Sequence, residues 1–139
     1  MLDEREQGLL LNVASRSIRE GLASGRPLVV RPEDFPGPLA EPGACFVTLH
    51  RNGELRGCIG SLEAHRPLVN DVAENAYAAA FRDPRFLPLQ ATELDDLELD
   101  ISVLSTPEPI EFSDEEELLV TSLGPGDRVR VKPGELVPA

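Results

Sequence analysis

One cysteine in this sequence has the surroundings of a reactive thiol. Cys58 lies between two glycines in the segment Arg-Gly-Cys-Ile-Gly, residues 56–60. Glycine removes side-chain bulk and lets a ligand approach the backbone, and the guanidinium of Arg56 favours the thiolate, which is the nucleophilic form. Cys58 and Arg56 are therefore candidate catalytic residues, and Gly57 and Gly60 are candidate ligand-binding positions. The alternative is a small buried cysteine whose glycines let a helix pack closely.

A second candidate motif follows about 25 residues later, as the numbering shows. Asp83, Arg85 and Phe86 belong to the segment Asp-Pro-Arg-Phe, in which a carboxylate and a guanidinium flank a proline turn. We interpret these three residues as candidate ligand-binding positions. The alternative is that the two charges pair with each other or with Arg56.

Neither a catalytic dyad nor a metal site is complete in the sequence. His50 and His65 are the two histidines. His65 follows the predicted strand of Cys58 and could serve as its base, or it is a solvated loop histidine. Cys45 and Cys58 with one histidine lack the spacing of a zinc site. We predict no metal and no cofactor.

The elements that position these residues include a hairpin. Residues 44–50 and 55–62 are predicted strands, and the Asn-Gly pair between them favours a type I′ turn. A two-residue turn pairs residue 51 with 54, 49 with 56 and 47 with 58. Cys58 then shares a face with Arg56, and His50 points to the opposite face. Cys45 and Cys58 become diagonal neighbours at roughly 7–8 Å, which is long for a disulfide, so two free thiols are expected.

The residues before the hairpin predict one helix and one loop. Asp3 and Glu6 form a possible capping arrangement, and apolar residues at helical spacing follow until Gly25 ends the helix. The stretch 31–43 holds four prolines and two glycines and is predicted to be a loop.

The residues after the hairpin favour a mixed fold. A second helix begins at Pro67 and ends before Pro84. Alternating residues predict a strand over 97–103, and an acidic run before apolar residues predicts a short helix within 114–120. Because helices and strands do not follow a regular βαβ order, the sequence predicts one α+β domain over residues 1–139, with helices packed on a largely antiparallel sheet.

The chain is strongly acidic. Its formal net charge is −12, which disfavours nucleic acids and anionic membranes as partners, because both attract clustered Lys and Arg. No apolar run approaches the roughly 18–20 residues that span a bilayer. The charged first residues lack the apolar stretch of a signal peptide, and two cysteines do not make a secreted disulfide framework. We therefore predict a cytoplasmic protein.

Four segments resemble one known family in order and spacing. They are residues 43–49 (Gly-Ala-Cys-Phe-Val-Thr-Leu), 53–62 (Gly-Glu-Leu-Arg-Gly-Cys-Ile-Gly-Ser-Leu), 79–89 (Ala-Ala-Phe-Arg-Asp-Pro-Arg-Phe-Leu-Pro-Leu) and 99–104 (Leu-Asp-Ile-Ser-Val-Leu). On these motifs the chain is identified as a member of the AMMECR domain family. Bacterial and archaeal members of that family are called AmmeMemoRadiSam system protein A.

The resemblance implies a fold, partners and a longer chain. The family fold is α+β with a smaller accessory lobe. Prokaryotic members are associated with a Memo-like protein, related to metal-dependent dioxygenases, and with a radical SAM enzyme. Family members usually continue through a strand and a C-terminal helix, whereas residues 134–139 end this chain near that point. We therefore expect a domain that lacks the family's C-terminal segment.

Two functions are consistent with these observations. The first is an accessory or substrate-presenting component of a system linked to Memo and radical SAM proteins. The alternative is an enzyme that uses Cys58 as a nucleophile or redox thiol on a small substrate. A reachable Cys58 near a base or cation favours the enzyme, and an exposed apolar patch favours the partner module.

Overall fold

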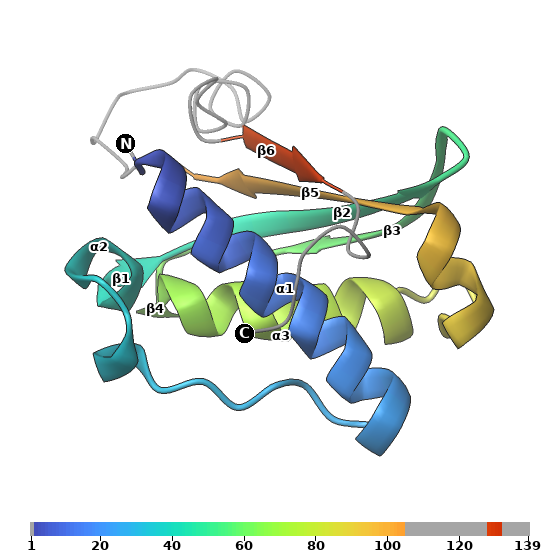
Figure 1. The fold of residues 1–139 in the computed structure, drawn as a ribbon, viewed down its shortest axis with the longest axis horizontal. Coiled ribbons are helices and arrows are strands. Elements are labelled where there is room, and N and C mark those ends of the chain that lie inside the picture. Colours follow the sequence, from blue (N-terminus) through green and yellow to red (C-terminus); the bar gives the residue numbers. More distant parts are fainter. Residues whose placement is uncertain (1, 105–127, 132–139) are drawn as a thin grey trace.

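The computed structural model describes residues 2–104 and the backbone of residues 128–131. Two long helices pack against one face of a four-stranded antiparallel sheet (Figure 1), so the α+β class predicted from the sequence is confirmed. None of the helices in these residues is long and apolar enough to cross a membrane. The elements are α1 (Glu4–Ser24), η1 (Pro32–Asp34), α2 (Gly37–Ala40), β1 (Pro42–Gly43), β2 (Cys45–Arg51), β3 (Glu54–Gly60), β4 (Arg66–Pro67), α3 (Leu68–Phe81), η2 (Ala91–Asp96), β5 (Leu97–Val103) and β6 (Arg128–Val131).

The sheet has the strand order β3-β2-β5-β6, and β1 pairs with β4 in a separate two-stranded ribbon. Residues 129–131, whose alternation is visible in the sequence, belong to β6. The short helix predicted within 114–120 lies outside the described residues.

The first helix begins and ends as the sequence predicts. The Asp3 carboxylate accepts the backbone N–H of Glu6 at 2.8 Å, and the Glu6 carboxylate accepts the N–H of Asp3 at 2.9 Å. This reciprocal capping box satisfies donors that the first helical turn leaves without partners. Gly25 follows the helix with φ of 75°, a left-handed conformation that glycine adopts without strain.

The stretch 31–43 is more structured than the predicted loop. It contains η1, α2 and β1, and prolines occupy the first turns of η1 and α2. Proline is tolerated there because its missing N–H would have no helical acceptor. Leu39 of α2 is fully buried. The prediction of a plain loop is therefore wrong at α2, where one buried leucine fixes the helical turn against the core.

The β2–β3 hairpin has the predicted turn. Asn52 and Gly53 have φ of 53° and 82°, as a type I′ turn requires. Arg51 pairs with Glu54, which is the predicted partner.

The predicted register fails one residue further along. The pairing shifts by one residue between Leu49 and His50 of β2. Leu49 therefore faces Gly57, and Thr48 faces Cys58. Arg56 has no partner across the ladder and is the extra residue of a β-bulge. A bulge of one residue turns every later side chain to the other face of the sheet. The prediction that Cys58 shares a face with Val47 is therefore wrong.

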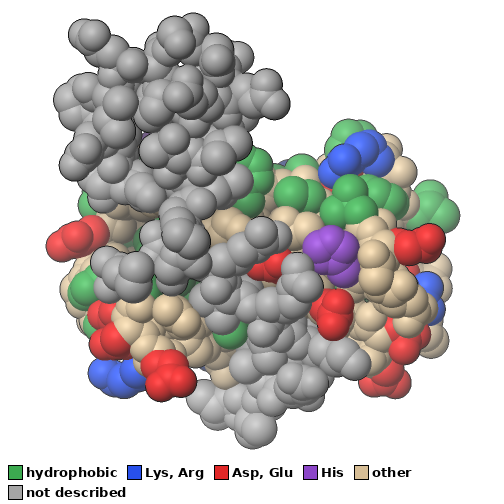
Figure 2. Space-filling view, turned by 90° about the horizontal axis from the view of Figure 1, so that it is seen from above, with side chains coloured by type: hydrophobic (Ala, Val, Ile, Leu, Met, Phe, Trp, Pro, Cys, Tyr) green, Lys and Arg blue, Asp and Glu red, His purple; other side chains and the backbone are tan. Residues whose placement is uncertain are grey.

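The two faces of the sheet differ in what they contact. Toward α1 and α3, Cys45, Val47 and Leu49 of β2 are fully buried. The other face, which we call the outer face, carries Thr48, His50 and Cys58 according to the register. Figure 2 shows this face, where hydrophobic side chains gather beside a histidine. Cys45 and Cys58 therefore lie on opposite faces, and both are unpaired thiols.

The core lies between the helices and the inner face of the sheet. Apolar side chains of α1, α3, β2 and β5 meet there, and burial at roughly 25 cal/mol per Å² of apolar surface stabilises the arrangement. The fully buried members with large side chains are Val13, Ile18, Leu39, Val47, Leu49, Val69, Val72, Leu97, Leu99 and Ile101.

Candidate functional site

The thiol of Cys58 lies on the outer face with a hydroxyl beside it. Its Sγ is 3.1 Å from Oγ1 of Thr48, the residue opposite it on β2. Cys58 is half-buried rather than enclosed in the core. His50 is the next outer-face residue along β2, so the register places it on the same side as the thiol. The prediction that His50 points away from Cys58 is wrong because of the bulge.

The backbone of Cys58 is fixed by Asp83. β3 is the edge strand of the described sheet, and an edge strand has N–H groups without a strand partner. The N–H of Cys58 donates to Oδ2 of Asp83 at 3.0 Å. Asp83 follows the end of α3 and is 4% exposed. The two sequence motifs are therefore joined in space by one charge-assisted hydrogen bond.

Asp83 also holds Arg85 in a two-point ion pair. Nε and Nη2 of Arg85 donate to Oδ1 and Oδ2 of Asp83 at 3.0 and 2.7 Å. These side-chain bonds lower the pKa of the Asp83 carboxyl well below its usual range, and the backbone N–H of Cys58 lowers it further. The same bond from Asp83 raises the pKa of the Arg85 guanidinium, and the charge of Cys58 adds to that effect. Asp83 thus connects the guanidinium of Arg85 to the backbone of Cys58.

Arg56 is bound by other partners than this ion pair. Its Nε and Nη2 donate to the Glu93 carboxylate at 2.8 and 3.1 Å, and Nη2 also donates to the carbonyl oxygen of Leu87 at 2.8 Å. Hydrogen bonding to Arg56 lowers the pKa of the Glu93 carboxyl. The guanidinium of Arg56 lies 5.8 Å from the ring centre of Phe86, and that of Arg85 lies 5.4 Å from it. Both distances suit a cation–π contact.

Both glycines of the motif have packing contacts. A Cβ built at Gly57 would overlap the carbonyl oxygen of Ala79 in α3, and one built at Gly60 would overlap the ring of Phe46. Gly57 therefore lets α3 approach β3, as the packing alternative predicts. Gly60 lets an aromatic ring cover the strand.

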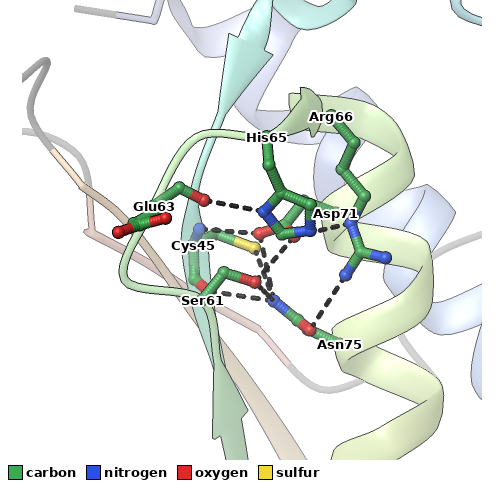
Figure 3. A network of polar contacts seen from close by, with 7 residues as sticks. All are labelled: Cys45, Ser61, Glu63, His65, Arg66, Asp71 and Asn75. Carbon is green, nitrogen blue, oxygen red and sulfur yellow. Dashed lines mark hydrogen bonds and ion pairs between the residues drawn. The ribbon is translucent and has the colours of Figure 1, made fainter.

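A second polar cluster joins the start of β2 to α3 (Figure 3). Asp71 is fully buried, and its carboxylate accepts four hydrogen bonds. Nε of Arg66 and Oγ of Ser61 donate to Oδ1, both at 2.8 Å. The backbone N–H of Cys45 and the side-chain amide of Asn75 donate to Oδ2 at 2.9 and 3.0 Å. Sequence reasoning missed this cluster.

The second cluster also contacts Cys45, through its backbone N–H and carbonyl oxygen. Burial raises the pKa of the Cys45 thiol well above its usual range, and the charge of Asp71 raises it further. His65, which Figure 3 also shows, is exposed, and its Nδ1 lies 3.0 Å from the carbonyl oxygen of Glu63. It is a solvated loop histidine, as one of the two predictions has it. Among the described residues, no group of three His, Cys, Asp or Glu side chains is arranged to hold a metal ion.

Comparison with known proteins agrees with the resemblance seen in the motifs. The model of the AMMECR1 family matches residues 11–131. This chain belongs to the AMMECR1 family. A protein of Methanothermobacter thermautotrophicus is 42% identical over 108 residues, covering 77% of this chain and 56% of the relative. A protein of Thermofilum pendens is 38% identical over 127 residues, covering 84% of this chain and 59% of the relative.

The AMMECR1 fold is also found in a solved structure. The crystal structure of the uncharacterized protein PH0010 from Pyrococcus horikoshii matches with a TM-score of 0.72 and 37% identity, covering 80% of this chain and 57% of that one. The chain thus spans a little over half the length of these relatives. Their names state no activity, so the function must be argued from the site.

The AMMECR1 domain brings most of the predicted site residues together. Cys58, Asp83, Arg85 and Phe86 form one continuous set of contacts, and Arg56 reaches it through the ring of Phe86. Sequence reasoning missed Thr48 and Glu93. The signal for Glu93 was a Gln-x-x-Glu spacing at residues 90–93, which forms a capping box at the start of η2.

Removing the charge of Asp83 should change how stability depends on pH. The folded state lowers the pKa of Asp83, so its contribution is full above the unfolded value near 3.9 and is lost as pH falls toward the folded value. We expect Asp83→Asn to lower the free energy of unfolding by about 1–3 kcal/mol at pH 7. The difference from wild type should shrink below about pH 4. Urea unfolding of wild type and Asp83→Asn at pH 7, 5, 4 and 3 measures the loss of stability at pH 7 and its decrease at low pH.

Asp34→Asn is the matched control for this experiment. Asp34 pairs with Arg31 at 3.4 Å on the surface, where both side chains are more than half exposed. The same chemical change there should alter stability by less than about 1 kcal/mol at any pH. A difference between Asp83→Asn and wild type that stays constant down to pH 3 would contradict the role of the Asp83 charge.

Proposed function

We propose that this AMMECR1 domain works through Cys58, as a component that captures a small electrophilic substrate on its thiol and presents it to partner proteins. The observation that carries the proposal is the setting of Cys58. The thiol is half-buried on the outer face, 3.1 Å from the hydroxyl of Thr48, and Asp83 joins the backbone N–H of Cys58 to the guanidinium of Arg85. A hydroxyl beside the sulfur assists its attack as a nucleophile.

The local groups support one chemical step. The sulfur of Cys58 donates an electron pair to an electrophilic carbon, a carbon–sulfur bond forms, and the displaced pair moves to the carbonyl oxygen or to the leaving group. Once the thiol is ionised, the hydroxyl of Thr48 is the donor of the contact between the two side chains. His50 lies on the same face of the sheet as the thiol, and the thiol proton passes to solvent before the attack.

The partner side of the proposal rests on the family resemblance and on exposed leucines. The Memo-like and radical SAM proteins associated with prokaryotic relatives are the proposed partners. Leu87 is 82% exposed, and its carbonyl oxygen is held by Arg56. Leu55 of the hairpin is 41% exposed. Apolar side chains presented on a fixed backbone suit a docking surface.

Selective alkylation tests the thiol directly. The folded protein is treated with iodoacetamide at pH 7.5, and both cysteines are followed by mass spectrometry. We expect Cys58 to be labelled at least about tenfold faster than Cys45. Burial raises the pKa of the Cys45 thiol and so lowers the fraction of the reactive thiolate there. Thr48→Val keeps the shape of the neighbour, removes its hydroxyl, and should slow the labelling of Cys58.

Two results would count against the proposal. Protection of Cys58 until the protein is denatured would make it a packing residue. Equal rates at the two cysteines would mean that the setting of Cys58 confers no reactivity. A Cys58→Ser variant, which should take up no label at this position in the folded state, confirms the assignment of the modified peptide.

A further inference from the structure

The guanidinium of Arg85 has N–H donors for which the described part of the chain supplies no acceptor. Arginine offers five N–H donors in a planar fork, and Asp83 takes one from Nε and one from Nη2. The donors of Nη1 and the second N–H of Nη2 point away from that carboxylate. The side chain of Arg85 is 56% exposed, whereas that of Asp83 is 2% exposed. The free side of the fork therefore faces the surface.

This free side is held in a fixed position. Asp83 also accepts the N–H of Arg85 at 3.1 Å, and the ring of Phe86 lies 5.4 Å from the guanidinium carbon. The other oxygen of Asp83 is bonded to the N–H of Cys58 at 3.0 Å. One carboxylate thus fixes both the cation and the backbone that carries the thiol. A planar fork of this kind matches a carboxylate or phosphate at two points.

We propose that the free edge of Arg85 binds an anionic group, a carboxylate in the first instance, of the substrate that reacts at Cys58. This inference rests on the proposed function of Cys58 and adds the class of substrate. A local cation is needed for such a substrate because the chain as a whole has a formal charge of −12 and repels anions. Arg56 adds a second guanidinium at 5.8 Å from the centre of the Phe86 ring, and its Nη1 is a buried donor without a hydrogen-bond acceptor among the described residues.

Two alkylating reagents of nearly equal size test the charge preference. Iodoacetate is an anion and iodoacetamide is neutral. Each reacts by the same displacement: the thiolate forms a carbon–sulfur bond, the carbon–iodine bond breaks, and iodide leaves with the bonding electrons. The measured quantity is the ratio of the iodoacetate rate to the iodoacetamide rate at Cys58 of the full chain. Taking this ratio on one protein cancels changes in the exposure or ionisation of the thiol.

The ratio of the iodoacetate rate to the iodoacetamide rate should depend on Arg85 specifically, and not on Arg82. We expect Arg85→Gln to lower it about two- to fivefold, the range of a partly exposed charge pair. The matched control is Arg82→Gln. Arg82 is also exposed at the end of α3, but its guanidinium lies over the ring of Tyr77 at 5.4 Å. The Arg82→Gln substitution removes the same charge as Arg85→Gln, but the ratio of the two rates should stay within about 1.5-fold of wild type.

Salt gives a second measurement that needs no variant. If net charge dominated, screening the repulsion would raise the ratio as salt increases. If Arg85 attracts the anion, the ratio should fall between 0.05 and 1 M NaCl, where the Debye length shrinks to about 3 Å. A ratio that rises with salt, or one unchanged by Arg85→Gln, overturns the anion site and leaves the thiol function intact. A Cys58 that reacts with neither reagent overturns both.

Discussion

Replacing Asp71 by alanine is expected to lower the free energy of unfolding by about 3–5 kcal/mol, because breaking a buried charge pair leaves groups without partners. Asp71 is fully buried and carries four hydrogen bonds from three different parts of the chain.

The cost comes mainly from donors that cannot reach water. The N–H of Cys45 is buried, and Asp71 accepts its hydrogen bond. A buried donor without an acceptor costs roughly 1–3 kcal/mol. Arg66 is different because its side chain is 31% exposed and can be hydrated again. Asn75 keeps its bonds to the carbonyl oxygen of Cys45 and to Ser61. The loss is therefore large but should not abolish folding.

Urea unfolding followed by circular dichroism measures the change. Asp71→Asn keeps the size of the side chain and should lose less than Asp71→Ala. Glu74→Ala is the control, because Glu74 is an exposed carboxylate on the same helix, and its loss should change stability by no more than about 0.5 kcal/mol. If Asp71→Ala and Glu74→Ala were equally mild, the cluster would not be a structural centre.

The elements that the sequence predicts well are those set by short-range chemistry. The capping box at Asp3 and the Asn-Gly turn at residues 52–53 depend on neighbours within four positions, and both were found. The alternating strand over 97–103 is β5, with the predicted bounds. Such features need no knowledge of distant contacts, because local hydrogen bonds and φ preferences decide them.

The features that were missed depend on contacts between distant segments. The bulge at Arg56 places Gly57, rather than Cys58, against Ala79 of α3, and only glycine leaves room for the helix there. Asp71 and Asn75 are four residues apart on α3, a spacing that puts two polar side chains on one face beside the apolar stripe. That spacing was a signal for the buried cluster.

The candidate site was predictable in its members but not in its pairings. The sequence places Arg56 beside Cys58, yet Arg56 is bonded to Glu93, and Arg85 is the arginine that Asp83 joins to the backbone of Cys58. Asp83 and Arg85 pair with each other, which was the alternative prediction. A pair formed inside one motif leaves its outward donors available, so pairing and ligand binding do not exclude each other.

The second large effect is expected at Gly57. We predict that Gly57→Ala lowers the free energy of unfolding by about 2–3 kcal/mol, as overpacking in a well-filled interior does. The added methyl group would overlap the carbonyl oxygen of Ala79, which is backbone and cannot turn aside as a side chain can. Either α3 moves away from β3 or the strand bends. Chemical unfolding measures the loss, and Gly8→Ala is the control.

The control should change stability in the opposite direction. Gly8 lies in α1 with open space around its Cα, so alanine there should stabilise the protein by roughly 0.5–1 kcal/mol through helix propensity. The reactivity of Cys58 distinguishes Gly57→Ala from Gly8→Ala further. Moving α3 withdraws Asp83 from the N–H of Cys58, so Gly57→Ala should change the alkylation rate of Cys58 under conditions where the variant remains folded. Unchanged stability together with an unchanged rate would mean that the close approach of α3 to β3 does not position the thiol.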